Sequence, residues 1–139
     1  MKDYFNVKLP DGEIQNISSL GLAHVGDAVF ELMVRVWLCS RGKITSRSLH
    51  RAAVTYVSAS AQSSAAETLK PRLTEEELAV YKRGRNAHVN SVPNSSSYEQ
   101  YHAATGLEAL FGFLYLSGRT ERLNELFDAV VSEPAVRGK

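Results

Sequence analysis

The chain has 139 residues, of which 44% are hydrophobic and 22% are charged, and its formal net charge is +1. This length suits one ordinary domain, and the composition is that of a soluble globular protein rather than a disordered or fibrous one. The longest apolar stretch, LEALFGFLYL at 107–116, is shorter than the roughly 20 residues that span a membrane and contains Glu108. A single cysteine, Cys39, excludes an internal disulfide and a multi-cysteine metal site.

The first residues lack the basic and apolar regions of a signal peptide. We therefore expect a cytoplasmic location, or a plastid one if a transit peptide has been removed.

Residues 1–16 contain the turn-forming sequence LPDGE and no sustained period, so we expect them to be irregular. A first helix is then predicted from Ser18 or Ser19, either of which can cap it, to Gly42, which suits a left-handed stop. Its apolar residues cover almost the whole circumference. We therefore expect this helix to be the central one.

Thr45 or Ser46 begins a second predicted helix, which Pro71 closes. A third begins with TEEE, where Thr74 and Glu77 have the spacing of a capping box, and runs toward 84. The stretch NAHVNSVPNSSS at 86–97 is rich in Asn, Ser and Pro and is longer than most loops.

A fourth long helix is capped by Ser96 or Ser97 and ends at Gly118, and Thr120 caps a fifth, amphipathic helix. No segment alternates with a period of two over enough residues to form a sheet. The predicted fold class is therefore all-α.

Carboxylates interrupt the two most apolar helices. Asp27 stands in LAHVGDAVFE, and Glu108 stands in TGLEALFGF. Burying an ionised carboxylate costs several kcal/mol unless a countercharge or a metal compensates it. Gly26 on the first helix, and Gly106 and Gly112 on the fourth, would let the helices cross closely and bring the carboxylates together.

Two adjacent carboxylates repel each other, and a hard divalent cation is a common remedy. Magnesium takes one or two protein carboxylates and keeps several waters, so this pattern predicts a magnesium-dependent phosphodiesterase. The alternative for each residue alone is an exposed or salt-bridged carboxylate, with Arg35 and Arg51 as available partners.

The net charge gives no general argument for binding a polyanion, but positive charge is locally concentrated. The segment 41–51 has four basic side chains and His50 but no acid, and YKRGRNAH at 81–88 forms a second cluster. Either cluster could contact phosphates; the alternative is that both are solvated helix faces.

Three motifs in order resemble the ribonuclease III family: LAHVGDAVFEL at 22–32, YVSASAQ at 56–62 and TGLEALFGFLYL at 105–116. The resemblance covers about residues 18–127. Ala23 and Thr105 stand where most members of the family have further acidic residues. Those departures, with LHRAA at 49–53 and KRGRNA at 82–87, are similar to the Mini-III ribonucleases.

This resemblance implies a homodimeric helical bundle like the ribonuclease III catalytic domain, occupying 17–132, with a flexible tail at 133–139 and no separate domain for binding double-stranded RNA. It implies an endoribonuclease that cleaves double-stranded RNA, matures precursor 23S ribosomal RNA and leaves 5′-phosphate and 3′-hydroxyl ends. Ribosomal proteins are candidate partners. The alternative is a non-catalytic RNA-binding or ribosome-assembly protein on the same fold.

The family's metal-binding and catalytic carboxylates correspond to Asp27 and Glu108, with Mg²⁺ as the implied cofactor and Mn²⁺ as a substitute. Glu31, one helical turn beyond Asp27, either assists through a water or forms an ordinary salt bridge. For RNA binding the candidates are His50, Arg51, Arg83, Arg85 and Asn86. Any sequence preference is assigned to the loop 87–97.

Overall fold

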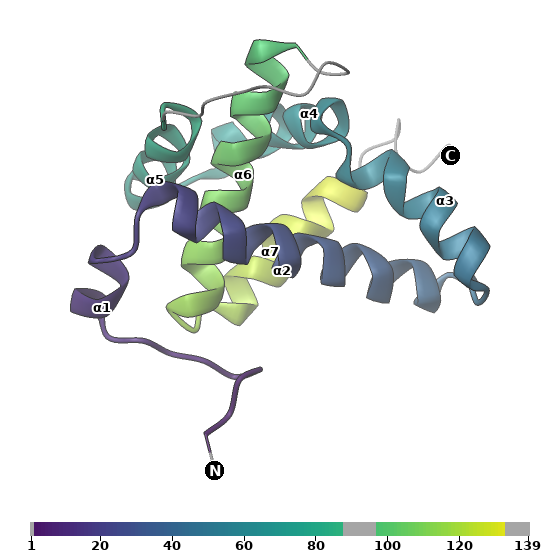
Figure 1. Cartoon of the computed structure of the whole chain (residues 1–139), viewed down its shortest axis with the longest axis horizontal. Helices are drawn as coiled ribbons and strands as arrows, with labels where there is room; N and C mark the ends of the chain where they lie inside the picture. Colours follow the sequence, from purple (N-terminus) through teal and green to yellow (C-terminus); the bar gives the residue numbers. More distant parts are fainter. Residues whose placement is uncertain (1, 88–96, 133–139) are drawn as a thin grey trace.

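The computed structural model describes residues 2–87 and 97–132, and within these ranges its regular elements are helices (Figure 1). In chain order they are α1 (Asp11–Gln15), α2 (Ser19–Ser40), α3 (Ser46–Val57), α4 (Ala59–Leu69), the 3₁₀ turn η1 (Lys70–Arg72), α5 (Glu75–Arg85), α6 (Tyr98–Leu116) and α7 (Thr120–Val131). The all-α prediction is confirmed. None of the described helices is long and apolar enough to cross a membrane.

Local signals at the helix ends are confirmed. The Ser18 hydroxyl accepts a hydrogen bond from the Gly21 amide and caps α2. Gly42 and Gly118 follow α2 and α6 with φ of +94° and +75°, the left-handed conformation that glycine adopts without a Cβ clash. Thr74 forms the expected capping box with Glu77 at the start of α5.

The single helix predicted between 45 and 71 is wrong, because the chain breaks at Ser58. This residue is extended, with φ −62° and ψ 155°, and its hydroxyl accepts from the Ala61 amide to cap α4. Serine offers the backbone such a non-helical alternative.

Two smaller differences from the sequence predictions are found at α1 and at the start of α7. The short helix α1 lies within the segment expected to be irregular, with its apolar residue Ile14 buried. Arg119, not Thr120, is the N-cap of α7. The expectations for residues 88–96 and 133–139 lie outside the described residues.

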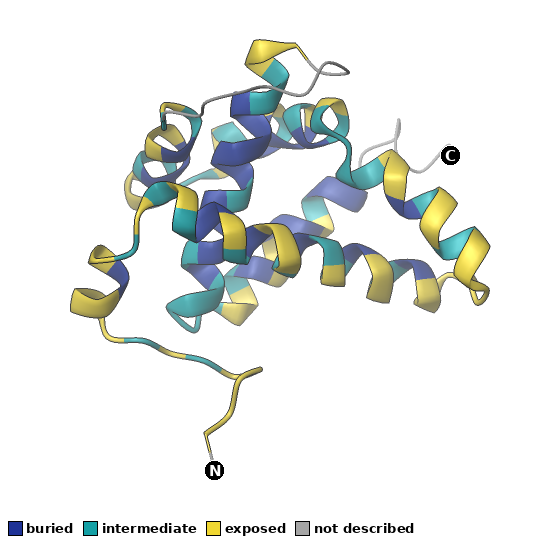
Figure 2. Ribbon diagram, in the orientation of Figure 1, coloured by how far each residue is buried: buried dark blue, intermediate teal, exposed yellow. Residues whose placement is uncertain are grey.

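The main core surrounds α6 and includes buried apolar residues of α2, α3, α4 and α7. Phe30 of α2 contacts Phe111 of α6 and Phe127 of α7 edge-on, with ring centroids 5.3 and 5.9 Å apart. Figure 2 shows α6 buried over most of its length and α2 exposed along one side. The expectation that α2 is the central helix is therefore wrong: Leu32 and Val36 are 51% and 60% exposed.

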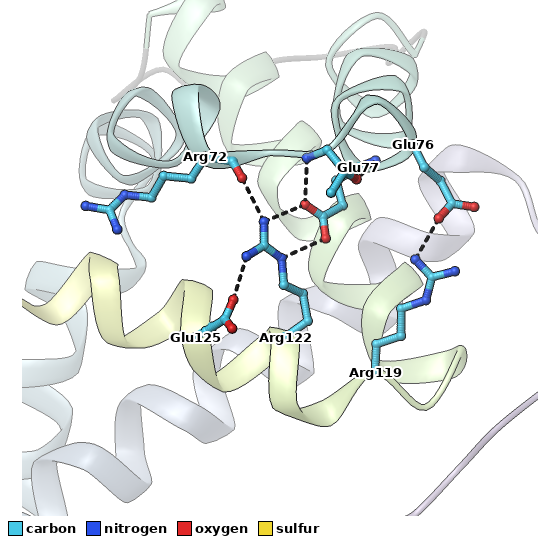
Figure 3. A network of polar contacts seen from close by, with 7 residues as sticks. Arg72, Glu76, Glu77, Arg119, Arg122 and Glu125 are labelled. Atoms are coloured by element: carbon cyan, nitrogen blue, oxygen red, sulfur yellow. Dashed lines mark hydrogen bonds and ion pairs between the residues drawn. The ribbon is translucent and has the colours of Figure 1, made fainter.

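A buried ion pair connects α5 to α7 (Figure 3). The Arg122 guanidinium donates to both carboxylate oxygens of Glu77 at 2.8 Å, and it also donates to the Arg72 carbonyl and to Glu125. The Glu77 side chain is only 3% exposed. The hydrogen bond from Arg122 lowers the pKa of Glu77 below its usual value, so the pair stabilises the ionised form.

We predict that Arg122→Met lowers the free energy of unfolding by about 3 kcal/mol or more, because it leaves a buried carboxylate without its countercharge. Denaturant unfolding at pH 7 measures this effect. Arg119→Met is the matched control: it removes an exposed pair with Glu76 and should cost less than about 1 kcal/mol.

The stabilisation by Glu77 is present above the usual carboxyl pKa and is lost as the pH falls through its lowered pKa. The difference between the wild-type protein and Arg122→Met should therefore narrow in acid. Equal losses in the two variants, or a gap that widens in acid, would contradict this account.

Candidate active site

The backbones of α2 and α6 touch where two glycines cross. A Cβ atom added to Gly26 would overlap the carbonyl oxygen of Glu108, and one added to Gly112 would overlap the carbonyl oxygen of Leu22. The predicted crossing is thus confirmed for these two glycines. Gly106 serves a different contact, since a Cβ there would lie 2.8 Å from the Tyr81 ring on α5.

The crossing brings the carboxyl groups of Asp27 and Glu108 near each other. Glu108 is half-buried and Asp27 is exposed, which corrects the expectation that Asp27 lies inside the core. That expectation followed from the apolar residues around almost the whole circumference of α2, but this helix is covered on one side only. Burial raises the pKa of Glu108 to about 8, and the negative charge of Asp27 and a hydrogen bond with it act in the same direction.

A third polar side chain at the site, Gln62 on α4, was missed by the sequence analysis. It is 2% exposed, and its hydrogen bond with Glu108 acts to lower the pKa of that carboxyl group. Gln62 shares the buried face of α4 with Ala65, Ala66 and Leu69. An amide at a core position of an otherwise apolar helical face was the signal that could have identified it.

Ala23 and Thr105, which stand where most members of the family have further acidic residues, are both buried. Ala23 is 6% exposed, and the Thr105 hydroxyl donates to the Tyr101 carbonyl at 3.1 Å.

Among residues 2–87 and 97–132, no three His, Cys, Asp or Glu side chains gather closely enough to hold a metal ion. Glu31 is paired with Arg35 at 3.2 Å.

The first group of predicted RNA-binding residues, His50 and Arg51, is exposed on α3. Arg51 borders a groove of about 580 Å³ whose other basic residues are Arg41, Lys43 and Arg47. Trp37 forms part of the wall, with the Arg41 guanidinium 5.0 Å from its ring centroid.

The second group lies at the end of α5, where Arg83 and Asn86 are exposed and Arg85 is half-buried. Figure 1 places α3 and α5 toward opposite ends of the long axis of the molecule. The structure therefore does not bring the two predicted RNA-binding groups together within one chain.

Residues 20–119 match the family described as the Ribonuclease III domain. The chain therefore belongs to the ribonuclease III family, and the prediction of a double-strand-specific endoribonuclease is confirmed by this membership.

Its similarity extends to particular relatives. It is 47% identical over 110 residues to the Mini-ribonuclease 3 of Symbiobacterium thermophilum, covering 79% of this chain and 85% of the relative. It is 48% identical over 107 residues to that of Brevibacillus brevis, covering 77% and 80%. The resemblance to the Mini-III ribonucleases is thus confirmed. Both relatives are bacterial and lend no support to a plastid location.

A crystal structure of a Fusobacterium nucleatum protein has the same fold. It superimposes with a TM-score of 0.79 at 30% sequence identity, over 87% of this chain and 98% of that one.

We predict that Gly26→Ala destabilises the protein by about 3 kcal/mol or more, because the new methyl group must force apart two backbones that cannot rearrange like side chains. Gly12→Ala is the control, since a Cβ there meets nothing within 4 Å. Denaturant unfolding compares the two variants. Similar stabilities would show that the helices do not cross in contact at Gly26.

Proposed function

We propose that this chain cleaves both strands of double-stranded RNA at a divalent-metal site formed by Asp27 and Glu108, and that it does so as a homodimer. The observation that carries the proposal is the glycine crossing, which sets a half-buried carboxyl group beside an exposed carboxylate. Maturation of precursor 23S ribosomal RNA is the role associated with the Mini-ribonuclease 3 family, and we assign it to this chain, in the cytoplasm.

Ribonuclease III proteins generally depend on a divalent metal, and the residues at this crossing suit Mg²⁺. Two carboxylates fit an ion that takes few protein ligands and keeps its remaining positions for water and phosphate oxygens. Burial and then the negative charge of Asp27 raise the pKa of Glu108, and a cation between the two residues would favour the charged form of its carboxyl group. Mn²⁺ accepts the same oxygen ligands and should substitute. When bound, such an ion polarises phosphoryl oxygens and lowers the pKa of a bound water.

The residues around Asp27 and Glu108 have separate roles in the proposed site. The glycines set the separation of the helices, and Asp27 and Glu108 would hold the ion between them. The buried amide of Gln62 favours the charged form of the Glu108 carboxyl group. Asp27 is exposed, which leaves its side of the site accessible to an RNA phosphate.

For RNA binding we propose His50, Arg51, Arg83, Arg85 and Asn86. A-form RNA presents phosphates and 2′-hydroxyl groups across a shallow minor groove, and cationic and amide side chains suit both. The groove beside α3 has four basic residues: Arg41, Lys43, Arg47 and Arg51. None of them forms a salt bridge within the part of the chain that the structure describes. Their uncompensated charge favours phosphate and predicts salt-sensitive binding.

The exposed side of α2 supports the homodimer. Leu32 and Val36 lie on it, beside a cavity of about 570 Å³ lined largely by apolar residues, including Val25, Val29 and Phe5. Exposed apolar patches of this kind mark association surfaces, and a two-fold dimer buries the same patch of both copies. A second copy would also add its own basic groups along the duplex. Assistance by ribosomal proteins stays a prediction.

We predict that Asp27→Asn and Glu108→Gln each lower the rate of cleavage of a long double-stranded RNA in Mg²⁺ by at least about 100-fold, the effect of losing several kcal/mol of charge stabilisation. RNA binding measured without metal should change little. Glu31→Gln is the control, since this carboxylate lies one turn from Asp27 but pairs with Arg35.

Cleavage by both variants at the wild-type rate would overturn the metal site. If the wild-type protein and both variants bind equally and none cuts, even in Mn²⁺ at low salt, the non-catalytic RNA-binding alternative replaces the enzyme.

We predict that Leu32→Glu converts the protein to monomers, because a charge would be desolvated at the centre of the dimer contact. Sedimentation or light scattering measures the mass. Val54→Glu is the control: this valine is 48% exposed on α3 and lines neither pocket beside Leu32, so its replacement should leave the mass unchanged. A wild-type monomer at micromolar concentration would contradict the proposed dimer.

A further inference from the structure

A buried histidine of α6 holds the end of α5. His102 is 7% exposed, and its Nδ1 lies 3.0 Å from the carbonyl oxygen of Arg85. A carbonyl can only accept, so Nδ1 carries the hydrogen and donates it. Because α5 ends at Arg85, this carbonyl is among the last four, which have no partner within their own helix. The imidazole therefore caps α5 from the neighbouring helix.

The remaining contacts of the ring do not explain why the residue is histidine. Nε2 is buried and has no hydrogen-bond partner among the described residues, which costs free energy. The ring packs against Tyr98 and Tyr101, with centroids 4.1 and 5.7 Å away. An apolar side chain would pack there without the unpaired nitrogen. The donor at Nδ1 is thus the feature that distinguishes histidine at this position.

The Arg85 side chain is also restrained. Its guanidinium lies 5.7 Å from the ring centroid of Tyr81, and its Nε donates to the Asn86 side chain at 3.3 Å. Tyr81 is itself fixed, because it is 1% exposed and packs against Gly106 of α6. A free arginine side chain loses up to about 2 kcal/mol of conformational entropy when a ligand immobilises it. Restraining it beforehand reduces that loss.

We propose that His102 is a positioning residue for RNA binding: its hydrogen bond fixes the end of α5 on α6, so that Arg85 and Asn86 meet the RNA backbone in a preformed geometry. The same helix α6 carries Glu108, so the contact also sets the distance between these RNA-binding side chains and the cleavage site. This inference rests on the proposed function, in which Arg85 and Asn86 bind RNA.

The test compares His102→Leu, which removes the donor and keeps the bulk, with His102→Asn, whose amide nitrogen takes the place of Nδ1. Binding of an RNA duplex is measured without divalent metal over a range of KCl concentrations, for each variant alone and for His102→Leu combined with Arg85→Gln. Ser117→Ala is the control, because it removes a side-chain to backbone hydrogen bond at the other end of α6.

We expect His102→Leu to weaken binding roughly tenfold, the loss of one charge-assisted contact, and to lower the slope of log Kd against log [KCl] by about 1. His102→Asn should restore both quantities. In the Arg85→Gln background, His102→Leu should weaken binding by a smaller factor than it does in the wild-type protein, because part of its effect passes through Arg85 and only the part through Asn86 remains.

Two results would overturn the inference while leaving the proposed function intact: wild-type binding by His102→Leu when Arg85→Gln is impaired, or multiplicative losses in the double variant. The same conclusion follows if Ser117→Ala reproduces the changed salt slope, because the effect is then general destabilisation. If Arg85→Gln itself binds normally, the assignment of Arg85 to RNA is wrong and the inference fails with it.

Discussion

The contact between the backbones of α2 and α6 at Gly26 and Gly112 is the constraint on which the rest of the structure depends. Without side chains at these positions, the two long helices approach closely enough for Asp27 and Glu108 to meet. Glu108 stands on α6, which is buried over most of its length, and the proposed metal site would require it to carry a charge there. A cation shared with Asp27 would stabilise that charge, so the close packing at the glycines would also create the proposed metal site.

Much of this arrangement was predictable because its signals are local. Capping serines, the left-handed glycines and the capping box at Thr74 depend on neighbouring residues, and the glycines beside Asp27 and Glu108 indicated where helices approach. The features that the sequence did not predict correctly depend on tertiary contacts. Periodicity shows that α2 has apolar residues on most sides but not which side this chain covers. The break between α3 and α4 depends on the Ser58 hydroxyl, which competes with helical hydrogen bonding of the backbone. Gln62 can be recognised as part of the site only from its interaction with Glu108 on another helix.

A single chain does not provide a continuous surface for the proposed binding of double-stranded RNA. Its basic groups lie on α3 and at the end of α5, far apart in the molecule, while an apolar side of α2 is left uncovered. A homodimer would cover that side and extend both basic groups along one duplex, which accounts for RNA binding by a chain with a net charge of only +1. Within each copy, the contact from His102 to Arg85 connects one of the proposed RNA-binding groups to the helix of Glu108.

The central claim is that Asp27 and Glu108 jointly hold a divalent cation. Anomalous diffraction from crystals of the wild-type protein soaked in Mn²⁺ tests it most directly, because the ion is located without reference to activity. The account predicts an anomalous peak within bonding distance of a carboxylate oxygen of each residue, and no peak there in crystals of Asp27→Asn. A wild-type site without manganese, or manganese bound only to other residues, would contradict it.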